Sequence, residues 1–343
     1  MKKQTIIILS IVALILIIGI ICGFSLLNKK VRNNESVSLY IYPSENYEKV
    51  LEKLEKNGVI EKKERAFSIF SKVKKLENNI KSGHYVIEPK TSQVDLVRTL
   101  ANGLQTPVKL VINKVRLKQD FANKIANQLM LSENDILLAI DNRENSQNLF
   151  DNIVCNTYEV YWNISAEKLL ERLEKEANKW WKNQSNQLEK IGLSRHEVVV
   201  LASIVEEETN KNEEKPTIAG VYINRLKKDM LLQADPTVKY AVGDFTIKRV
   251  MYKHLQTESP YNTYLNKGLP PTAICLPELS SLKAVLNYQK HNYMFFCAKE
   301  DFSGYHNFAT TPNEHYRNAE RYKNALNKSF FSTYALDNSI LVL

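Results

Sequence analysis

Three consecutive glutamates, Glu206, Glu207 and Glu208, follow the largely apolar run VVVLASIV and are the first candidates for chemistry in this chain. Ser194 and Glu197 have the spacing of a capping box, which predicts a helix that begins there and continues through the glutamates. A carboxyl group shielded from water titrates near neutral pH and can act as a general acid. The segment therefore predicts an acid–base site at the end of a helix.

Helical periodicity favours the last of the three glutamates. Leu201, Ile204 and Val205 share a face with Glu208, so a carboxylate continues an apolar stripe. A solvated helix end is the alternative, but negative charge near a helix C-terminus costs roughly 0.3 to 1 kcal/mol per group. We predict that Glu208 is the catalytic residue, and Glu206 remains the alternative.

Two later segments carry side chains that suit a sugar-binding groove. Gln233 and Asp235 come before Pro236, so we expect them in a turn or an extended loop. Residues 259–278 combine tyrosines and amides with prolines that stiffen the backbone. The candidate substrate-binding residues are Gln233, Asp235, Tyr261, Asn262, Thr263, Gly268, Pro270 and His306.

Two folded units are expected to position these residues, because 343 residues with 44% hydrophobic content can bury two modest cores. The fold class is predicted to be α+β. A small α/β module at residues 36–105 precedes a larger mixed α/β domain at residues 106–343.

Capping patterns and periodicity place individual helices within these units. Ser92 and Asp95 predict the start of one helix, and Gly103 predicts its end. A long amphipathic helix is expected to begin at Ser165 and to direct Trp180 toward a core.

Residues 6–27 form an uncharged apolar run that is long enough to cross a bilayer core of about 30 Å. The run is longer than the apolar part of a signal peptide, so residues 1–30 are predicted to be a retained transmembrane anchor. A cleaved signal peptide and lipidation of Cys22 remain alternatives. Basic residues flank both ends, so the positive-inside rule gives no orientation.

Cysteine count and charge exclude several classes of function. Outside the apolar run, Cys155, Cys275 and Cys297 match no metal-binding or redox spacing, and no metal or cofactor is expected. The net charge of +9 comes from lysines scattered among glutamates, which indicates a solvated surface and not a nucleic-acid site. Such a surface also suits an anionic membrane or an acidic wall polymer.

Six motifs together resemble the endolytic murein transglycosylases of the YceG-like family. They are ASIVEEET (202–209), VYINRL (221–226), LQADPTV (232–238), YNTY (261–264), GLPPTAI (268–274) and HNF (306–308). Residues 83–103 resemble the LysM-like module that precedes the catalytic domain in that family. The sequence departs from the family pattern at Leu276, before Pro277, and at Cys155.

The resemblance implies cleavage of the β-1,4 bond between N-acetylmuramic acid and N-acetylglucosamine inside a glycan strand. The product would carry a 1,6-anhydromuramoyl end, and the cut would terminate the elongation of nascent strands. Glu208, followed by Thr209, matches the catalytic glutamate of the family motif, while Glu206 matches another recurrent position. No cofactor is implied.

The resemblance also implies a single-pass protein of the bacterial inner membrane whose catalytic domain faces the periplasm or the extracellular space. Its implied partners are peptidoglycan strands, the membrane and peptidoglycan synthases. Two other functions stay open: a hydrolytic muramidase with Asp235 as a second carboxylate, and a noncatalytic wall-binding or division scaffold.

Overall fold

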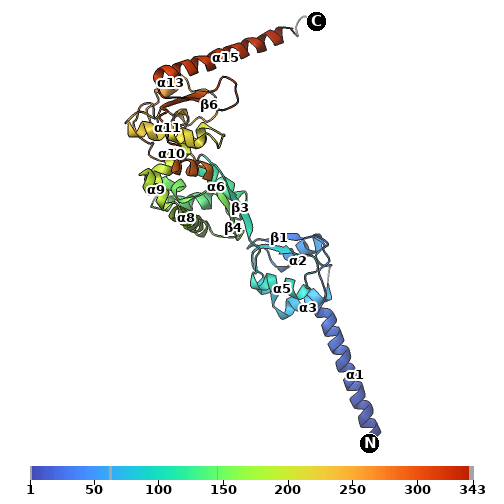
Figure 1. The fold of residues 1–343 in the computed structure, drawn as a ribbon. Coiled ribbons are helices and arrows are strands. Elements are labelled where there is room, and N and C mark those ends of the chain that lie inside the picture. The colour runs from blue at the N-terminus through green and yellow to red at the C-terminus, as the bar shows by residue number, and fades with distance from the viewer. Residues whose placement is uncertain (1, 62–63, 145, 340–343) are drawn as a thin grey trace. The chain divides into compact units, whose positions relative to one another are not determined.

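The computed structural model describes residues 2–61, 64–144 and 146–339, and its contacts divide the chain into two units (Figure 1). The first unit consists of Met1–Leu110, Gln128–Met130 and Glu159–Ile164, and the second of Val111–Asn127, Leu131–Tyr158 and Ser165–Leu343. The architecture mixes helices with small sheets, as predicted. The assignment of residues 36–105 and 106–343 to separate domains stays a prediction.

Helix α1, Lys2–Leu27, forms the N-terminus. Its stretch Ile6–Leu27 has a mean hydropathy of 3.3 and is not buried by the rest of the chain. Its length and composition suit a membrane span, and one such helix near an N-terminus fits an anchor and a signal sequence equally well. The apolar helix is confirmed, while its retention as an anchor stays a prediction.

After α1, the described residues of the first unit form a two-stranded sheet and four helices, together with parts of β3 (Val108–Ile112) and β4 (Asn156–Val160). Strands β1 (Val37–Ile41) and β2 (Gly83–Ile87) pair antiparallel, with Val37 opposite Ile87. The helices are α2 (Tyr47–Lys56), α3 (Arg65–Val73), α4 (Leu76–Asn79) and α5 (Gln93–Asn102). Leu39, Leu54 and Tyr85 are fully buried in the core that joins sheet to helices. That this unit is LysM-like stays a prediction.

Local signals set the ends of α5 as predicted. The Ser92 hydroxyl accepts a hydrogen bond from the Asp95 amide at 3.0 Å, which caps the first turn. Gly103 ends the helix at φ 66°, a left-handed conformation that favours glycine.

The remaining described elements are four short strands and a series of helices, of which α8 and α15 are long. Strand β3 (Val108–Ile112) pairs with β4 (Asn156–Val160), and β5 (Phe295–Ala298) pairs antiparallel with β6 (His306–Ala309). The helices are α6 (Lys118–Ala126), α7 (Glu133–Asp141), the 3-10 helix η1 (Ser146–Asn152), α8 (Ala166–Asn183), α9 (Ser185–Ile191), α10 (Arg195–Glu208), α11 (Lys215–Lys227), α12 (Asp235–Val242), α13 (Tyr252–Leu255), α14 (Leu279–Leu286) and α15 (Pro312–Ser339).

Helix α10 lies in the core of the second unit. Every residue from Val198 to Glu206 is buried, and η1, α11, α12 and α14 pack against the helix. The capping box at its start is confirmed, since the Ser194 hydroxyl accepts from the Glu197 amide at 3.2 Å. A helix that is apolar on all sides belongs in a core, so its C-terminal end is held firmly in place.

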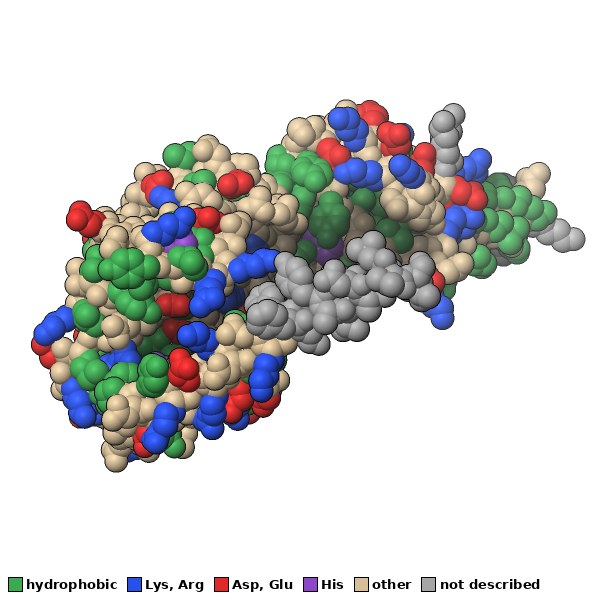
Figure 2. Space-filling view, turned by 90° about the horizontal axis from the view of Figure 1, so that it is seen from above, with side chains coloured by type: hydrophobic (Ala, Val, Ile, Leu, Met, Phe, Trp, Pro, Cys, Tyr) green, Lys and Arg blue, Asp and Glu red, His purple; other side chains and the backbone are tan. Residues whose placement is uncertain are grey.

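Helix α8 begins at its Ser165 cap as predicted, but it buries a different tryptophan from the one expected. Trp181 is 5% exposed, whereas Trp180 is only half-buried. The buried residue Ala177 lies four positions before Trp181, so the apolar face of the helix reaches Trp181. On the face that Figure 2 shows, basic and acidic side chains are interspersed, as expected for a solvated surface.

Candidate active site

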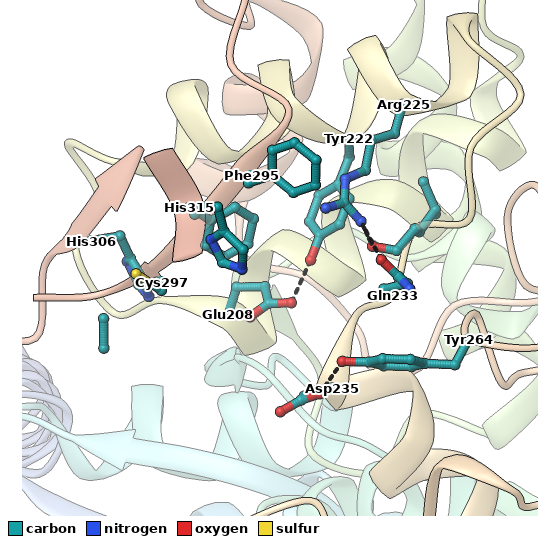
Figure 3. A pocket seen from close by; sticks show the side chains of 13 residues that line it. Glu208, Tyr222, Arg225, Gln233, Asp235, Tyr264, Phe295, Cys297, His306 and His315 are labelled. Atoms are coloured by element: carbon teal, nitrogen blue, oxygen red, sulfur yellow. Dashed lines mark hydrogen bonds between the residues drawn. The ribbon is translucent and has the colours of Figure 1, made fainter. Parts of the chain in front are cut away.

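Glu208, the last residue of α10, lines a cavity of about 370 Å³ in the second unit (Figure 3). Helix α11 contributes Tyr222 and Arg225, and the first turn of α12 contributes Asp235. Strands β5 and β6 form another wall, and His315 of α15 also lines the cavity. Residues of five further helices and strands therefore surround one carboxyl group.

The environment of Glu208 suits a proton donor. The Tyr222 hydroxyl donates a hydrogen bond to Oε1 of Glu208. Within the described residues Oε2 has no hydrogen-bond partner, which leaves it available to a ligand. Burial raises the pKa of Glu208 to about 7; the Tyr222 hydrogen bond lowers it, and the nearby Asp235 charge raises it further.

We expect activity to depend on the protonated form of Glu208. With a pKa of about 7, the rate should fall about tenfold per pH unit on the alkaline side. A profile of kcat against pH between about 5 and 9 measures this fall. A rate that stays level or rises between pH 7 and 9 would contradict the role of Glu208 as the acid.

Glu206 lies only two residues earlier but has a different environment. It is buried, accepts a hydrogen bond from Lys215 Nζ at 3.0 Å, and accepts a second one from the Ser281 hydroxyl. The Glu278 amide approaches the same carboxylate at 3.4 Å. These contacts join α10 to α11 and α14 through Oε2 of Glu206. The residue does not line the cavity.

Glu207 lies in a third environment, between two basic side chains. Lys114 Nζ and Arg116 Nη2 lie 2.7 Å and 2.8 Å from its two carboxylate oxygens. Although burial opposes its ionisation, the hydrogen bonds from Arg116 and Lys114 hold the pKa of Glu207 below its usual range. Of the three glutamates, Glu208 is the one that lines the cavity.

The structure brings three of the predicted substrate-binding residues into the same cavity as Glu208. Gln233 accepts a hydrogen bond from Arg225 Nη1 at 3.3 Å, and Asp235 accepts one from the Tyr264 hydroxyl at 2.7 Å. His306 lines the opposite side, as Figure 3 shows. Asp235 begins helix α12, and not a turn or an extended loop as predicted.

Asn262 and Thr263 are buried inside the loop that precedes α14 and do not line the cavity. Asn262 donates to the carbonyl oxygens of Leu255 and Thr257, both at 2.9 Å. The Thr263 hydroxyl accepts from the Ala234 amide at 3.0 Å. Thr263 therefore holds the backbone that carries Asp235, whereas Asn262 holds the end of α13 and the segment after it.

Tyr261, Gly268 and Pro270 also lie outside this cavity. Gly268 has φ 81°, which favours glycine at this turn, and Pro270 is buried. Tyr261 lines a different cavity of the same unit.

Arg225 is a cavity residue that our sequence reasoning did not single out. Its guanidinium is buried, stacks 5.1 Å from the Phe295 ring centroid, and donates to the carbonyl oxygens of Met294 at 2.7 Å and Leu232 at 2.9 Å. It therefore ties α11 to β5 and to the loop before α12. The VYINRL motif carried the signal, since Tyr222 and Arg225 lie three positions apart on one helix face.

Glu214 is a second residue that the sequence did not indicate. Its carboxylate accepts from the backbone amide of His306 at 2.9 Å and pairs with the ring Nδ1 of His306 at 2.9 Å. Because Nδ1 is engaged, the other ring nitrogen is left to face a ligand. Nothing in the local sequence relates residues 92 positions apart.

The cavity suits general acid chemistry on a polar substrate. The chain belongs to the YceG-like family, whose model matches residues 39–321. It is 29% identical over 298 residues to the endolytic murein transglycosylase of Bacillus subtilis (strain 168), which covers 80% of this chain and 81% of that protein. It is 24% identical over 338 residues to the endolytic murein transglycosylase of Streptococcus pneumoniae (strain D39), which covers 88% of this chain and 61% of that protein.

A solved structure is similar as well. The crystal structure of a YceG-like protein from Listeria monocytogenes aligns with a TM-score of 0.51 at 30% sequence identity. The alignment covers 83% of this chain and 99% of that one.

Proposed function

We propose that this chain is an endolytic murein transglycosylase that cuts the bond between N-acetylmuramic acid and N-acetylglucosamine, with Glu208 as its catalytic group. The observation that carries the proposal is the Glu208 carboxyl group, with a pKa of about 7, in a cavity lined by polar side chains. The names of the relatives from Bacillus subtilis and Streptococcus pneumoniae support it.

Glu208 first acts as an acid. Its proton passes to the glycosidic oxygen, the bond between that oxygen and the anomeric carbon breaks, and the electron pair leaves with the N-acetylglucosamine. Positive charge then develops on the muramoyl ring. The ionised Glu208 and the carboxylate of Asp235, which line the same cavity, are the proposed groups that stabilise this charge.

Glu208 then acts as a base. It accepts the proton of the muramoyl 6-hydroxyl while that oxygen bonds to the anomeric carbon, which restores the acid form and consumes no water. An internal nucleophile can have an effective concentration of about 10⁵ M or more, so one carboxyl group suffices. Gln233 and His306 are the proposed contacts to the strand.

The product tests this mechanism. The full-length protein in detergent micelles should convert murein into strands with 1,6-anhydromuramoyl ends, which are lighter by one water than hydrolysis products. In heavy-oxygen water the new ends should carry no label, as mass spectrometry would measure. Long strands should also shorten before terminal disaccharides accumulate.

Hydrolysis is the second candidate, because Asp235 supplies a second carboxylate in the cavity. Labelled reducing ends as the main product would favour it and would make Asp235 a catalytic residue. A failure to cut murein at all would favour the scaffold hypothesis.

We further propose that α1 is retained as an anchor and that the chain after residue 30 faces the periplasm or the extracellular space. The substrate of the proposed reaction lies there, and the uncharged stretch Ile6–Leu27 is long enough to span. Protease added to intact spheroplasts should digest the exposed part, as an immunoblot would detect. Protection until the membrane is permeabilised would reject this orientation. Peptidoglycan synthases remain proposed partners.

A further inference from the structure

One side of helix α12 lines three successive cavities of the second unit. Asp235 lines the catalytic cavity, Pro236 and Lys239 line a narrow cavity of about 50 Å³, and Tyr240 lines both this and a third cavity of about 340 Å³. Positions 235, 236, 239 and 240 share one side of a helix. We call the third space the outer cavity; Arg116, Gln119, Gln147, Tyr240, Tyr261 and Thr272 contribute to its lining.

The C-terminal residues of helix α10 also line two of these neighbouring cavities. Glu208 lines the catalytic cavity, and its neighbour Glu207 lines the narrow one. Glu207 binds Arg116 at 2.8 Å, and Arg116 lines both the narrow and the outer cavity. The three cavities therefore adjoin α12 between Asp235 and Tyr240, and the first two also adjoin the C-terminal end of α10.

The lining of the outer cavity suits a carbohydrate. The rings of Tyr240 and Tyr261 lie 4.7 Å apart at 49° and form a bent aromatic wall. The Tyr261 hydroxyl and the Thr272 hydroxyl share a hydrogen bond of 2.6 Å. Two exposed amides, Gln119 and Gln147, add donors and acceptors for hydroxyl groups.

The charges of the outer cavity favour a neutral ligand over an anionic one. Arg116 is paired with Glu207 at 2.8 Å, and Lys118 is paired with Asp141 at 2.8 Å. An anion would have to compete with these carboxylates for both cations. A polyhydroxylated chain needs only the rings and the polar groups already present.

We propose that the outer cavity is a sugar-binding subsite for the same glycan strand that the catalytic cavity cuts, an inference that rests on the proposed function. A strand held there extends beyond the cleaved bond along α12. The enzyme then gains affinity from sugars remote from the cut, which favours internal positions over strand ends.

Substitution of the aromatic wall tests this subsite. For full-length Tyr261→Ala in detergent micelles, the ratio of kcat/KM for long strands to kcat/KM for the shortest fragment cut should fall about tenfold, the loss expected for one well-packed aromatic contact. Gln147→Ala should shift the ratio in the same direction by a smaller factor, and its exposed position preserves the test if Tyr261→Ala does not fold.

Tyr252→Ala removes an exposed tyrosine of α13 that lines none of the three cavities, and it should keep the wild-type ratio. An equal loss on long and short strands, or no loss in either lining variant, would overturn the subsite.

Binding separates this proposal from the proposed function. If the wild-type protein cuts nothing, the proposed function fails, but the subsite can still be measured by titrating noncleaving Glu208→Gln protein with the same strands in a calorimeter. Adding Tyr261→Ala should raise Kd for long strands about tenfold. An unchanged Kd, or no binding of strands at all, would overturn the subsite.

Discussion

Replacing Glu208 with glutamine is expected to abolish detectable glycan cleavage, with a loss of at least about 10²- to 10⁴-fold in kcat. The amide keeps the shape of the side chain and can still accept a hydrogen bond from Tyr222, but it cannot donate the proton that the leaving oxygen needs. Release of soluble muropeptides from murein by the full-length protein measures the loss. Cleavage within tenfold of wild type would move the catalytic role elsewhere.

The same substitution should leave the fold intact. The pKa of Glu208 is raised from 4.5 to about 7, so the folded state binds its proton more tightly than the unfolded chain does. The stabilisation from that proton is complete below pH 4.5 and is lost as the pH rises through about 7. Above pH 7 the glutamine variant should therefore unfold at the wild-type temperature or slightly higher. A lower midpoint there would indicate a structural role.

Glu206→Gln is expected to destabilise the second unit by about 3 to 5 kcal/mol, because it leaves the buried ammonium group of Lys215 without its counter-charge. Denaturant unfolding followed by tryptophan fluorescence measures this loss. Activity per folded molecule should stay far above that of Glu208→Gln, since the Glu206 carboxylate does not line the cavity.

Two further variants control this result. Glu206→Gln combined with Lys215→Met removes both charges and should recover most of the lost stability. Glu213→Gln changes an exposed glutamate nearby and should alter the free energy of unfolding by less than about 0.5 kcal/mol. If the double variant were no more stable than Glu206→Gln, the unpaired charge would not be the cause.

Features that depend on neighbouring residues could be predicted from the sequence. The caps at Ser92, Ser165 and Ser194 are local hydrogen bonds, and all three begin helices as expected. The apolar helix at the N-terminus could also be predicted, because its length and composition alone define it.

Ranking the three glutamates by periodicity assumes that their helix has one buried, apolar face. Helix α10 is buried on every side, so no single apolar face distinguishes Glu208. The three carboxylates differ in their long-range partners, since Lys215 reaches Glu206 and Arg116 reaches Glu207. Sequence patterns do not reveal which distant cation meets which carboxylate.

The loop at residues 261–270 shows that residue types alone do not separate a binding role from a structural one. Its amides and hydroxyls suited a sugar-binding groove, yet Asn262 and Thr263 use theirs to satisfy the backbone of nearby loops. A loop without regular structure must pair its own polar groups, and the residue types that do so are also those that bind sugars. Only coordinates separate the two uses.

Arg225 donates hydrogen bonds to the carbonyl oxygens of Met294 and Leu232, so the cavity wall at β5 forms only after residue 294 has been synthesised. The acid, Glu208, is synthesised before β5, β6 and the His315 end of the cavity. If the chain after residue 30 crosses the membrane in sequence order, Glu208 would cross while one wall of the cavity is still missing. Under the proposed topology, the cavity around Glu208 would be complete only after nearly the whole polypeptide has emerged, and fragments truncated before residue 294 should not cut glycan strands.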